Sequence, residues 1–279
     1  MKAFPIGVII DSFRTDITSA VKKAASVGAQ GIQVYATNGE MAPENMNAKK
    51  IAEFKDLVAS NGLKISALCG DLGGGFGNKD ENPGKIERSK KILDLAKELG
   101  TDVVTTHIGV VPGDKSHERY KIMQEACFEL SRYADSIGAH FAIETGPETS
   151  LVLKEFLDSL NSTGVAVNLD PANLVMVTGD DPAKAVINLQ KYIVHTHAKD
   201  GKQLFYKDPE IVYGIVKSSL VTGPSFLEVP LGEGSVNWEE YLAALESIGY
   251  NGFLTIEREV GDDPERDIRG AVEFLKSKF

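Results

Sequence analysis

Short apolar runs alternate along the chain with amphipathic stretches, in the same order eight times. The runs are rich in Val, Ile, Phe and Ala and lack the polar alternation of a strand that faces water on one side. This pattern is typical of strands buried on both faces of a parallel sheet. We expect strands at residues 6–10, 31–35, 64–69, 102–107, 139–144, 164–170, 192–197 and 252–257.

Helical periodicity follows each of these runs. The spacing of apolar residues predicts helices at 17–26, 48–60, 83–99, 116–137, 150–161, 181–189, 238–248 and 264–277. At several junctions, such as SVGAQGIQV and SIGAHFAI, a Gly ends the helix just before the next strand, which fits a left-handed C-cap. Eight such units predict an α/β fold in which residues 1–279 form a single (β/α)8 TIM barrel domain. The alternative is a doubly wound sheet, but no GxGxxG follows the first strand.

Two connections, after strands three and seven, are long, and in a barrel they lie on the catalytic face. The first is GDLGGGFGNKDENPG, where four glycines permit unusual backbone angles around Phe76. Phe76 would close over a substrate, or the loop is simply flexible. The second runs from the seventh strand to Asn237, with a helical stretch DPEIVYGIVKSSL and an extended FLEVPLGEG.

Composition and charge narrow the function classes. The chain is 42% hydrophobic and 25% charged, as in ordinary globular proteins. Its 40 acidic and 30 basic residues give a formal net charge of -10, which argues against nucleic acid or anionic membrane as a partner. No run is long enough to span a bilayer, and the N-terminus does not fit a signal peptide. Cys69 and Cys127 are far apart, without CxxC spacing, so we expect a reducing cytoplasm.

Four of the apolar runs end on a side chain that can ligate a metal: Glu144, Asp170, His197 and Glu257. Burial of such groups is costly unless a cation, a proton or hydrogen bonds compensate it. In a barrel all four would converge on one mouth, although unrelated residues at loop entrances would give the same pattern. Three carboxylates and one imidazole suit a divalent metal ion such as Mn, Mg or Co, and Zn is possible. Without a cation the carboxylates would repel one another.

The contexts of these residues resemble one family. IETGPE, NLDPAN, HTHAKD and PLGEGSVNW, followed by TIERE, are similar to the xylose isomerase-like TIM-barrel superfamily, the sugar phosphate isomerases and epimerases, over nearly the whole chain. The resemblance implies that Glu144, Asp170, His197 and Glu257 bind the metal. It also implies that Glu144 and Glu257 flank a small-molecule carbohydrate as an acid/base pair.

The implied chemistry is proton abstraction from a carbon beside a carbonyl, through an enediolate. It requires a base near that carbon and a cation near the developing charge. Return of the proton on the opposite face gives epimerisation, and return at the neighbouring carbon gives aldose to ketose isomerisation.

Three further residues are candidates for substrate binding. His107 ends the fourth strand and resembles the family's substrate-binding His, although a core or capping His is the alternative. Lys199 would contact a hydroxyl or phosphate, or would pair with Asp200. Asn173 stands where relatives often carry His, which removes an imidazole donor.

Other residues are assigned structural roles. We expect His195 to be packed and hydrogen-bonded, Arg258 to pair with a loop carboxylate and Trp238 to pack its helix. Glu228 and Glu233 are left outside the site. A phosphate on the substrate would need an anion cradle, and the residues compatible with one are Gly201, Lys202, Gly232 and Gly234.

Three other functions compete. A dehydratase acting on an inosose or related polyol would use the same metal site, with elimination of water after proton abstraction. The apurinic endonuclease branch needs many His residues, whereas this chain has 5. A non-catalytic sugar-binding barrel would retain the four residues only as remnants. Relatives often pair or form tetramers, so a homo-oligomer is a further expectation.

Overall fold

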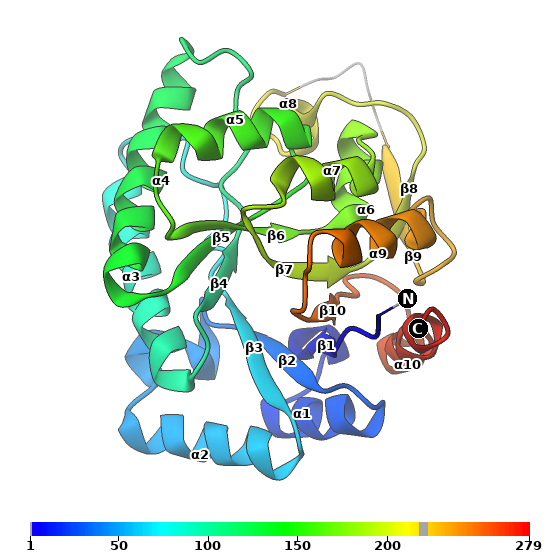
Figure 1. Ribbon diagram of the computed structural model, residues 1–279. Coiled ribbons are helices and arrows are strands. Elements are labelled where there is room, and N and C mark those ends of the chain that lie inside the picture. The colour runs from blue at the N-terminus through cyan, green and yellow to red at the C-terminus, as the bar shows by residue number, and fades with distance from the viewer. Residues whose placement is uncertain (1, 218–222) are drawn as a thin grey trace.

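Eight parallel strands form a closed barrel in the order β1-β10-β7-β6-β5-β4-β3-β2 (Figure 1). The computed structural model describes residues 2–217 and 223–279. The barrel strands are β1 (Ile6–Ile9), β2 (Gly31–Tyr35), β3 (Lys64–Cys69), β4 (Val103–Thr106), β5 (His140–Glu144), β6 (Val165–Leu169), β7 (Ile193–Ala198) and β10 (Leu254–Ile256). The predicted (β/α)8 TIM barrel is therefore confirmed.

Helices surround the barrel between successive strands. They are α1 (Ile17–Ser26), α2 (Ala48–Ser60), α3 (Asn82–Leu99), α4 (Glu118–Ile137), α5 (Ser150–Leu160), α7 (Pro182–Leu189), α9 (Trp238–Ser247) and α10 (Pro264–Lys276). Asp16, Asn47 and Asp181 cap α1, α2 and α7 by accepting hydrogen bonds from free backbone N–H groups. Gly100 and Gly138 end α3 and α4 in the left-handed conformation, as the junction pattern predicts.

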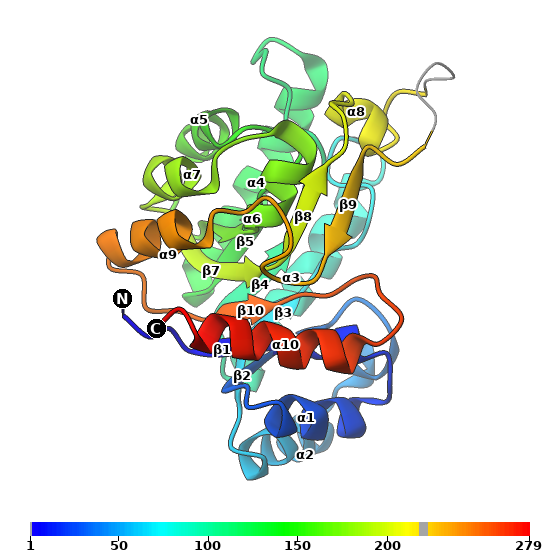
Figure 2. The same cartoon turned by 90° about the vertical axis from the view of Figure 1, so that its right-hand side faces the viewer.

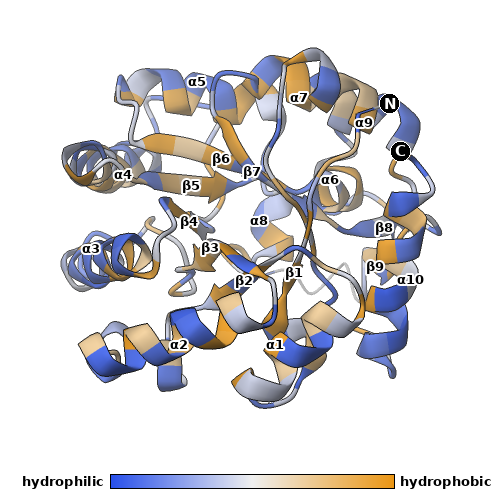
Figure 3. Cartoon of the chain, turned by 60° about the horizontal axis from the view of Figure 1, so that its bottom comes forward, coloured by the Kyte–Doolittle hydropathy of each residue, from blue (hydrophilic) through white to orange (hydrophobic). Residues whose placement is uncertain are grey.

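The apolar runs form strands because both of their faces are covered. All residues of β6 are buried, and the strands are largely hydrophobic while the surrounding helices carry both kinds of residue (Figure 3). Inside the barrel, Ala67, Val103, Ala142 and Ala166 pack together in a layer of small side chains. No helix of the described ranges is both long and apolar enough to cross a membrane.

The long connection after β7 leaves the barrel. β8 (Asp200–Gln203) and β9 (Phe226–Val229) form an antiparallel pair beside it, with α8 (Pro209–Val212) between them (Figure 2). The helical stretch predicted at 208–220 is helical only over α8, because Gly214 adopts a left-handed φ of 73° shortly after it. Residues 218–220 of that prediction lie outside the described part of the chain.

The loop after β3 differs from the lid predicted around Phe76. The Phe76 side chain is 2% exposed, and its ring meets Phe141 edge-on with centroids 6.0 Å apart. Gly75, at φ 62°, lies so close to the backbone of Ile108 that no side chain would fit there. Phe76 therefore anchors this loop to the core and does not close over a substrate.

A further short segment was not predicted. Residues after β6 form α6 (Pro171–Asn173) and a π-helical turn at Leu174–Thr178. This turn places Met176 and Val177 in the wall of the cavity described below. Single-turn π segments are common beside functional sites.

Candidate metal centre and active site

The four predicted metal ligands meet at one end of the barrel. Glu144 ends β5, Asp170 follows β6, His197 lies in β7 and Glu257 follows β10. All four side chains are buried, and each offers one ligand atom that lies within 4.8 Å of the others. Among the described residues this is the only group of three or more such side chains. The four buried side chains that the sequence analysis predicted as ligands are thus together in one site that could hold a metal ion.

The imidazole of His197 is oriented by the barrel interior. Its Nε2 lies 3.2 Å from the Oε1 of Gln33, whose amide donates to Thr105. A hydrogen on Nε2 would satisfy this acceptor, and the Nδ2 of Asn168 also lies 3.1 Å from Nε2. Nδ1 faces the carboxylates, at 3.5 Å from Glu144 and from Asp170 and 3.4 Å from Glu257. An outer hydrogen bond that fixes the tautomer is typical of metal-binding His.

His195 lies on the same strand, deeper in the barrel, as predicted. Its Nε2 is 3.1 Å from the same Oε1 of Gln33, and its side chain is 2% exposed. Burial, and then the charge of His197, lower the pKa of His195 to about 3. The residue is therefore a neutral, hydrogen-bonded part of the core.

One carboxylate oxygen of Asp170 indicates that the cluster binds a cation. Its Oδ1 accepts hydrogen bonds from the backbone N–H groups of Ala172 and Asn173. Its Oδ2 is buried and has no hydrogen-bond partner among the described residues. The nearest polar group is the Nδ1 of His197, at 3.5 Å. A buried carboxylate oxygen that accepts no hydrogen bond, next to two other carboxylates, is unfavourable unless a cation is present. The residues therefore fit a divalent metal ion.

Two amides hold the carboxylate of Glu144. Asn168 donates to Oε2 and Asn173 donates to Oε1, each at 3.0 Å. Burial alone would raise the pKa of Glu144, but the positive charges of His107 and His197 lower it. Asn173 also lines the cavity. The amide of Asn173 thus orients a carboxylate, a contact that the sequence analysis did not predict.

Lys199 is buried between carboxylates. Its Nζ lies 2.9 Å from the Oε2 of Glu257 and also contacts Glu259, and the residue is 4% exposed. Burial would lower the pKa of Lys199, but Glu257 and its neighbours raise it well above its usual value. The predicted pairing of Lys199 with Asp200 is wrong, because the Asp200 carboxylate lies among backbone donors.

His107 reaches the cluster from β4, with a partner that the sequence analysis missed. Its Nδ1 is 3.1 Å from the Oδ2 of Asp71, and its Nε2 is 3.5 Å from the Oε1 of Glu144. Burial would lower the pKa of His107, but Glu144 and Asp71 raise it to about 9. Asp71 follows β3 by two residues. The search for acidic residues at strand ends that identified the metal ligands could therefore also have found it.

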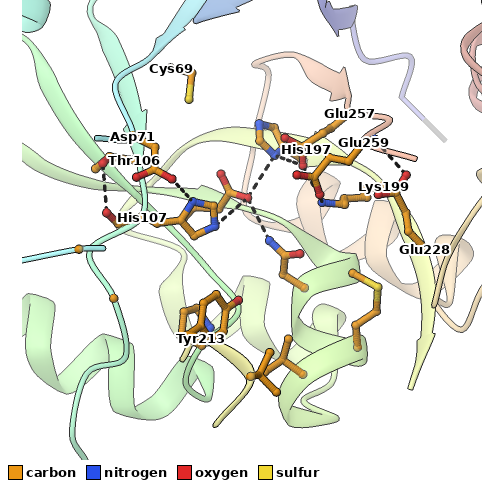
Figure 4. Close-up of a pocket in the computed structure, with 18 of the residues that line it drawn as sticks. Cys69, Asp71, Thr106, His107, His197, Lys199, Tyr213, Glu228, Glu257 and Glu259 are labelled. Atoms are coloured by element: carbon orange, nitrogen blue, oxygen red, sulfur yellow. Dashed lines mark hydrogen bonds and ion pairs between the residues drawn. The ribbon is translucent and has the colours of Figure 1, made fainter. Parts of the chain in front are cut away.

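These side chains border a cavity of about 390 Å³, within the range of small-molecule sites. His107 and Asp71 lie at one side, and Lys199, Glu257, Glu259 and Glu228 lie at the other (Figure 4). Glu228, which we left outside the site, therefore lines the cavity, and it pairs with Arg258 at 2.6 Å, as expected of that Arg. The connection between β7 and β10 also lines the cavity, through Val212, Tyr213, Ile215 and Phe226. Neither Glu259 nor Tyr213 was predicted from the sequence.

Glu148, in the IETGPE segment, is a buried acid outside this cluster. Its Oε2 accepts from the backbone N–H of Val111 at 3.2 Å, and its Oε1 has no partner among the described residues. Burial raises the pKa of Glu148 from 4.5 to about 8. Between those pH values the folded protein holds a proton that the unfolded chain has lost, so this residue's contribution to stability falls as pH rises.

We expect Glu148→Gln to flatten that dependence. In urea unfolding at pH 5, 6, 7 and 8, the wild-type protein should lose stability relative to the variant by about 1.4 kcal/mol per pH unit. The difference arises because Gln does not titrate. Identical pH slopes in the two proteins would contradict the assignment of a protonated acid at this position.

Comparison with known proteins identifies relatives over the whole chain. The solved structure of a xylose isomerase domain protein from Planctomyces limnophilus superposes with a TM-score of 0.80, at 25% identity, over 99% of this chain and 96% of that one. A D-tagatose 3-epimerase-like protein superposes with a TM-score of 0.73, at 21% identity, over 99% of each chain.

A curated relative matches a shorter segment. The inosose dehydratase of Lacticaseibacillus casei is 26% identical over 131 residues, which are 46% of this chain and 41% of the dehydratase. The profile of the xylose isomerase-like TIM barrel matches residues 21–278, which include every element from β2 to α10 and all four residues of the cluster. The chain therefore belongs to the xylose isomerase-like TIM-barrel family.

Proposed function

We propose that the protein is a divalent-metal-dependent isomerase or epimerase that removes a proton from the carbon beside a carbonyl of a carbohydrate. One observation carries this proposal. Two buried carboxylates, of Glu144 and Glu257, face one cavity around the Nδ1 of His197, beside an oxygen of Asp170 that accepts no hydrogen bond. Family membership supports an enzyme of this kind.

The metal ion would be held by Glu144, Asp170, His197 and Glu257. The three carboxylates favour Mn, Mg or Co, and Zn is possible. When bound, such a cation stabilises negative charge on the substrate oxygens as the enediolate forms. The negative formal charge of the cluster and its burial both favour capture of a divalent ion.

Glu144 and Glu257 are assigned the acid/base roles. His107 lowers the pKa of Glu144 and Lys199 lowers that of Glu257, each against the effect of burial, which favours the ionised form of both carboxylates. Asn168 and Asn173 hold Glu144 in place, and Lys199 holds Glu257. A substrate in the cavity would contact both carboxylates, so one would remove the proton and the other would return it. His107, Asn173 and Lys199, which line the cavity, are the proposed contacts to substrate hydroxyl groups.

A dehydratase is the second candidate. It is favoured by the similarity to inosose dehydratase and by Lys199, a protonated group in the cavity wall that could donate to a leaving hydroxyl. Identification of products separates the candidates. The metal-loaded protein would be incubated with ketoses, aldoses and inososes, and NMR would distinguish an epimer, an aldose–ketose pair or a dehydrated product. Sugar binding without any product would instead support a non-catalytic barrel.

Removal of the metal provides another test. We expect one divalent ion per chain by elemental analysis, and a fall in melting temperature when a chelator removes it. A ligand at about 100 times its Kd stabilises the folded state by about 2.7 kcal/mol, and 1 kcal/mol shifts the melting temperature by about 2–4 °C in chains of this size class. The expected fall is therefore about 5–10 °C.

Two variants control this measurement. Asp170→Asn should lose both the ion and the shift, while Asp56→Asn, which alters an exposed residue of α2, should keep both. An ion retained at full stoichiometry in Asp170→Asn would place the metal elsewhere. A cytoplasmic location and a homo-oligomer stay predictions.

A further inference from the structure

We propose that the substrate is an uncharged carbohydrate, a free ketose, aldose or cyclic polyol ketone that carries no phosphate or carboxylate group. This inference rests on the proposed function and specifies its substrate class. It follows from two independent observations. The loops that would hold a phosphate enclose an anion of the chain itself, and every Lys or Arg at the cavity is already paired.

The anion cradle predicted from Gly201, Gly232 and Gly234 is occupied by the side chain of Asp200. Its Oδ1 accepts from the backbone N–H groups of Gly201 at 2.9 Å and Val236 at 3.2 Å. Its Oδ2 accepts from the N–H of Gly232 at 3.0 Å and the indole N–H of Trp238 at 2.9 Å. Asp200 is 1% exposed. A phosphate in this position would meet a carboxylate and find its donors already used.

The PLGEG segment is rich in glycine because it closes around the carboxylate of Asp200, as Gly234 illustrates. A side chain at Gly234 would overlap the carboxylate of Asp200, so only glycine allows the loop to close around it. Lys202, the cation predicted for the cradle, is exposed on β8 and does not line the cavity. The glycines and the Asp therefore form a structural unit that ties the two loops together.

The cavity itself repels anions. The carboxylates that line it are those of Asp71, Glu144, Glu228, Glu257 and Glu259. Lys199 is the only Lys or Arg among the described lining residues, and it is paired with Glu257 and Glu259. Nearby Arg258 is held by Glu228 and Asp267 at 2.6 and 2.9 Å. With a divalent ion in place, the five lining carboxylates and Asp170 make six negative charges, against four positive charges from the ion, Lys199 and His107.

Sugar hydroxyl groups suit the same surface. They donate to carboxylates, and Asp71, Glu228 and Glu259 provide such acceptors at both sides of the cavity. Met176, Val177 and Phe226 provide an apolar wall for the C–H faces of a sugar. Anionic groups lack those donors and would face like charges, which strongly disfavours a wrong ligand.

Matched pairs of free sugars and their phosphates test this inference. The metal-loaded protein would be given D-fructose or D-fructose 6-phosphate, D-xylulose or D-xylulose 5-phosphate, and an inosose, in deuterated water. We expect kcat/KM for deuterium incorporation to be at least about tenfold higher for free sugars than for their phosphates. Equal or higher values for the phosphates would overturn the inference and leave the proposed function intact.

Calorimetric binding to the same metal-loaded protein separates the two hypotheses. If no sugar exchanges a proton, the proposed function fails, and the affinities still decide the substrate class. Tighter binding of free sugars supports an uncharged ligand. Tighter binding of the phosphates, or binding of neither, overturns the inference.

Glu259→Gln tests the electrostatic cause. Glu259 is 57% exposed at its side chain, so its amide should be tolerated, and the change removes one of the two carboxylates paired with Lys199. We expect the preference for free sugars over phosphates to shrink several-fold. The control, Glu240→Gln, alters an exposed residue of α9 and should keep the wild-type preference. An unchanged preference in Glu259→Gln would contradict the charge argument.

Discussion

Replacing Glu257 with Gln is expected to lower kcat for solvent exchange by about 10²–10⁴-fold, the usual effect of losing a general acid or base. The amide keeps the size of the side chain but accepts no proton. Glu144→Gln is expected to have an effect of the same order, because both residues are assigned to one proton-transfer pair. Initial rates of deuterium incorporation, measured at saturating metal, check this result.

Loss of metal is the main competing explanation for such a fall, since both residues also belong to the ligand set. Elemental analysis of each variant separates the two causes, because an inactive variant that keeps its ion has lost only the acid/base group. Glu240→Gln serves as the matched control and should keep wild-type rates. A metal-loaded Glu257→Gln with undiminished exchange would contradict the assignment.

Replacing Asp200 with Ala is expected to lower the free energy of unfolding by about 3–5 kcal/mol, because it leaves buried donors without their charged acceptor. Three backbone N–H groups and the indole N–H of Trp238 lose their partner. Urea unfolding of the metal-free protein measures the change without a contribution from the ion.

The control for this measurement is Asp56→Ala, an exposed change on α2 that should alter stability by no more than about 0.5 kcal/mol. A comparably small effect of Asp200→Ala would show that the cradle tolerates loss of its internal anion. The electrostatic argument for an uncharged substrate would then lose one of its two supports.

The strands could be predicted because their burial is encoded locally. A run such as VAVNL is covered on both faces, so every residue is selected for the interior. The ends of the eight predicted barrel strands, and of the helix predicted after each, lie within two residues of the observed ones. The four metal-position residues could be found for a related reason. Parallel strands of a closed barrel bring their carboxyl ends to one mouth, so an acid at a strand end has a predictable location.

The rest of the site depends on contacts between distant segments. Glu228, Glu259 and Tyr213 lie in connections whose paths are set by packing against the barrel, and no periodic pattern marks them. The sequence analysis also treated the glycines of PLGEG as a possible phosphate site, because the same loop chemistry serves an internal anion. Only the position of Asp200 decides between the two interpretations.

Asn173 is a residue whose role could not be predicted from the sequence. The resemblance led us to expect a His there, but the consequence of an Asn could not be predicted, because its amide in α6 donates to Glu144 at the end of β5. The role of such a residue depends on a distance that only the fold provides.

The most direct test of the central claim is a comparison of one protein sample with and without its divalent ion. Free ketoses and an inosose would be incubated in deuterated water, and NMR would follow deuterium at the carbon beside the carbonyl. Proton abstraction at the cluster of Glu144, Asp170, His197 and Glu257 predicts exchange that stops on chelation and returns when metal is restored. Exchange that persists in the metal-free protein, or none with the ion bound, would contradict it.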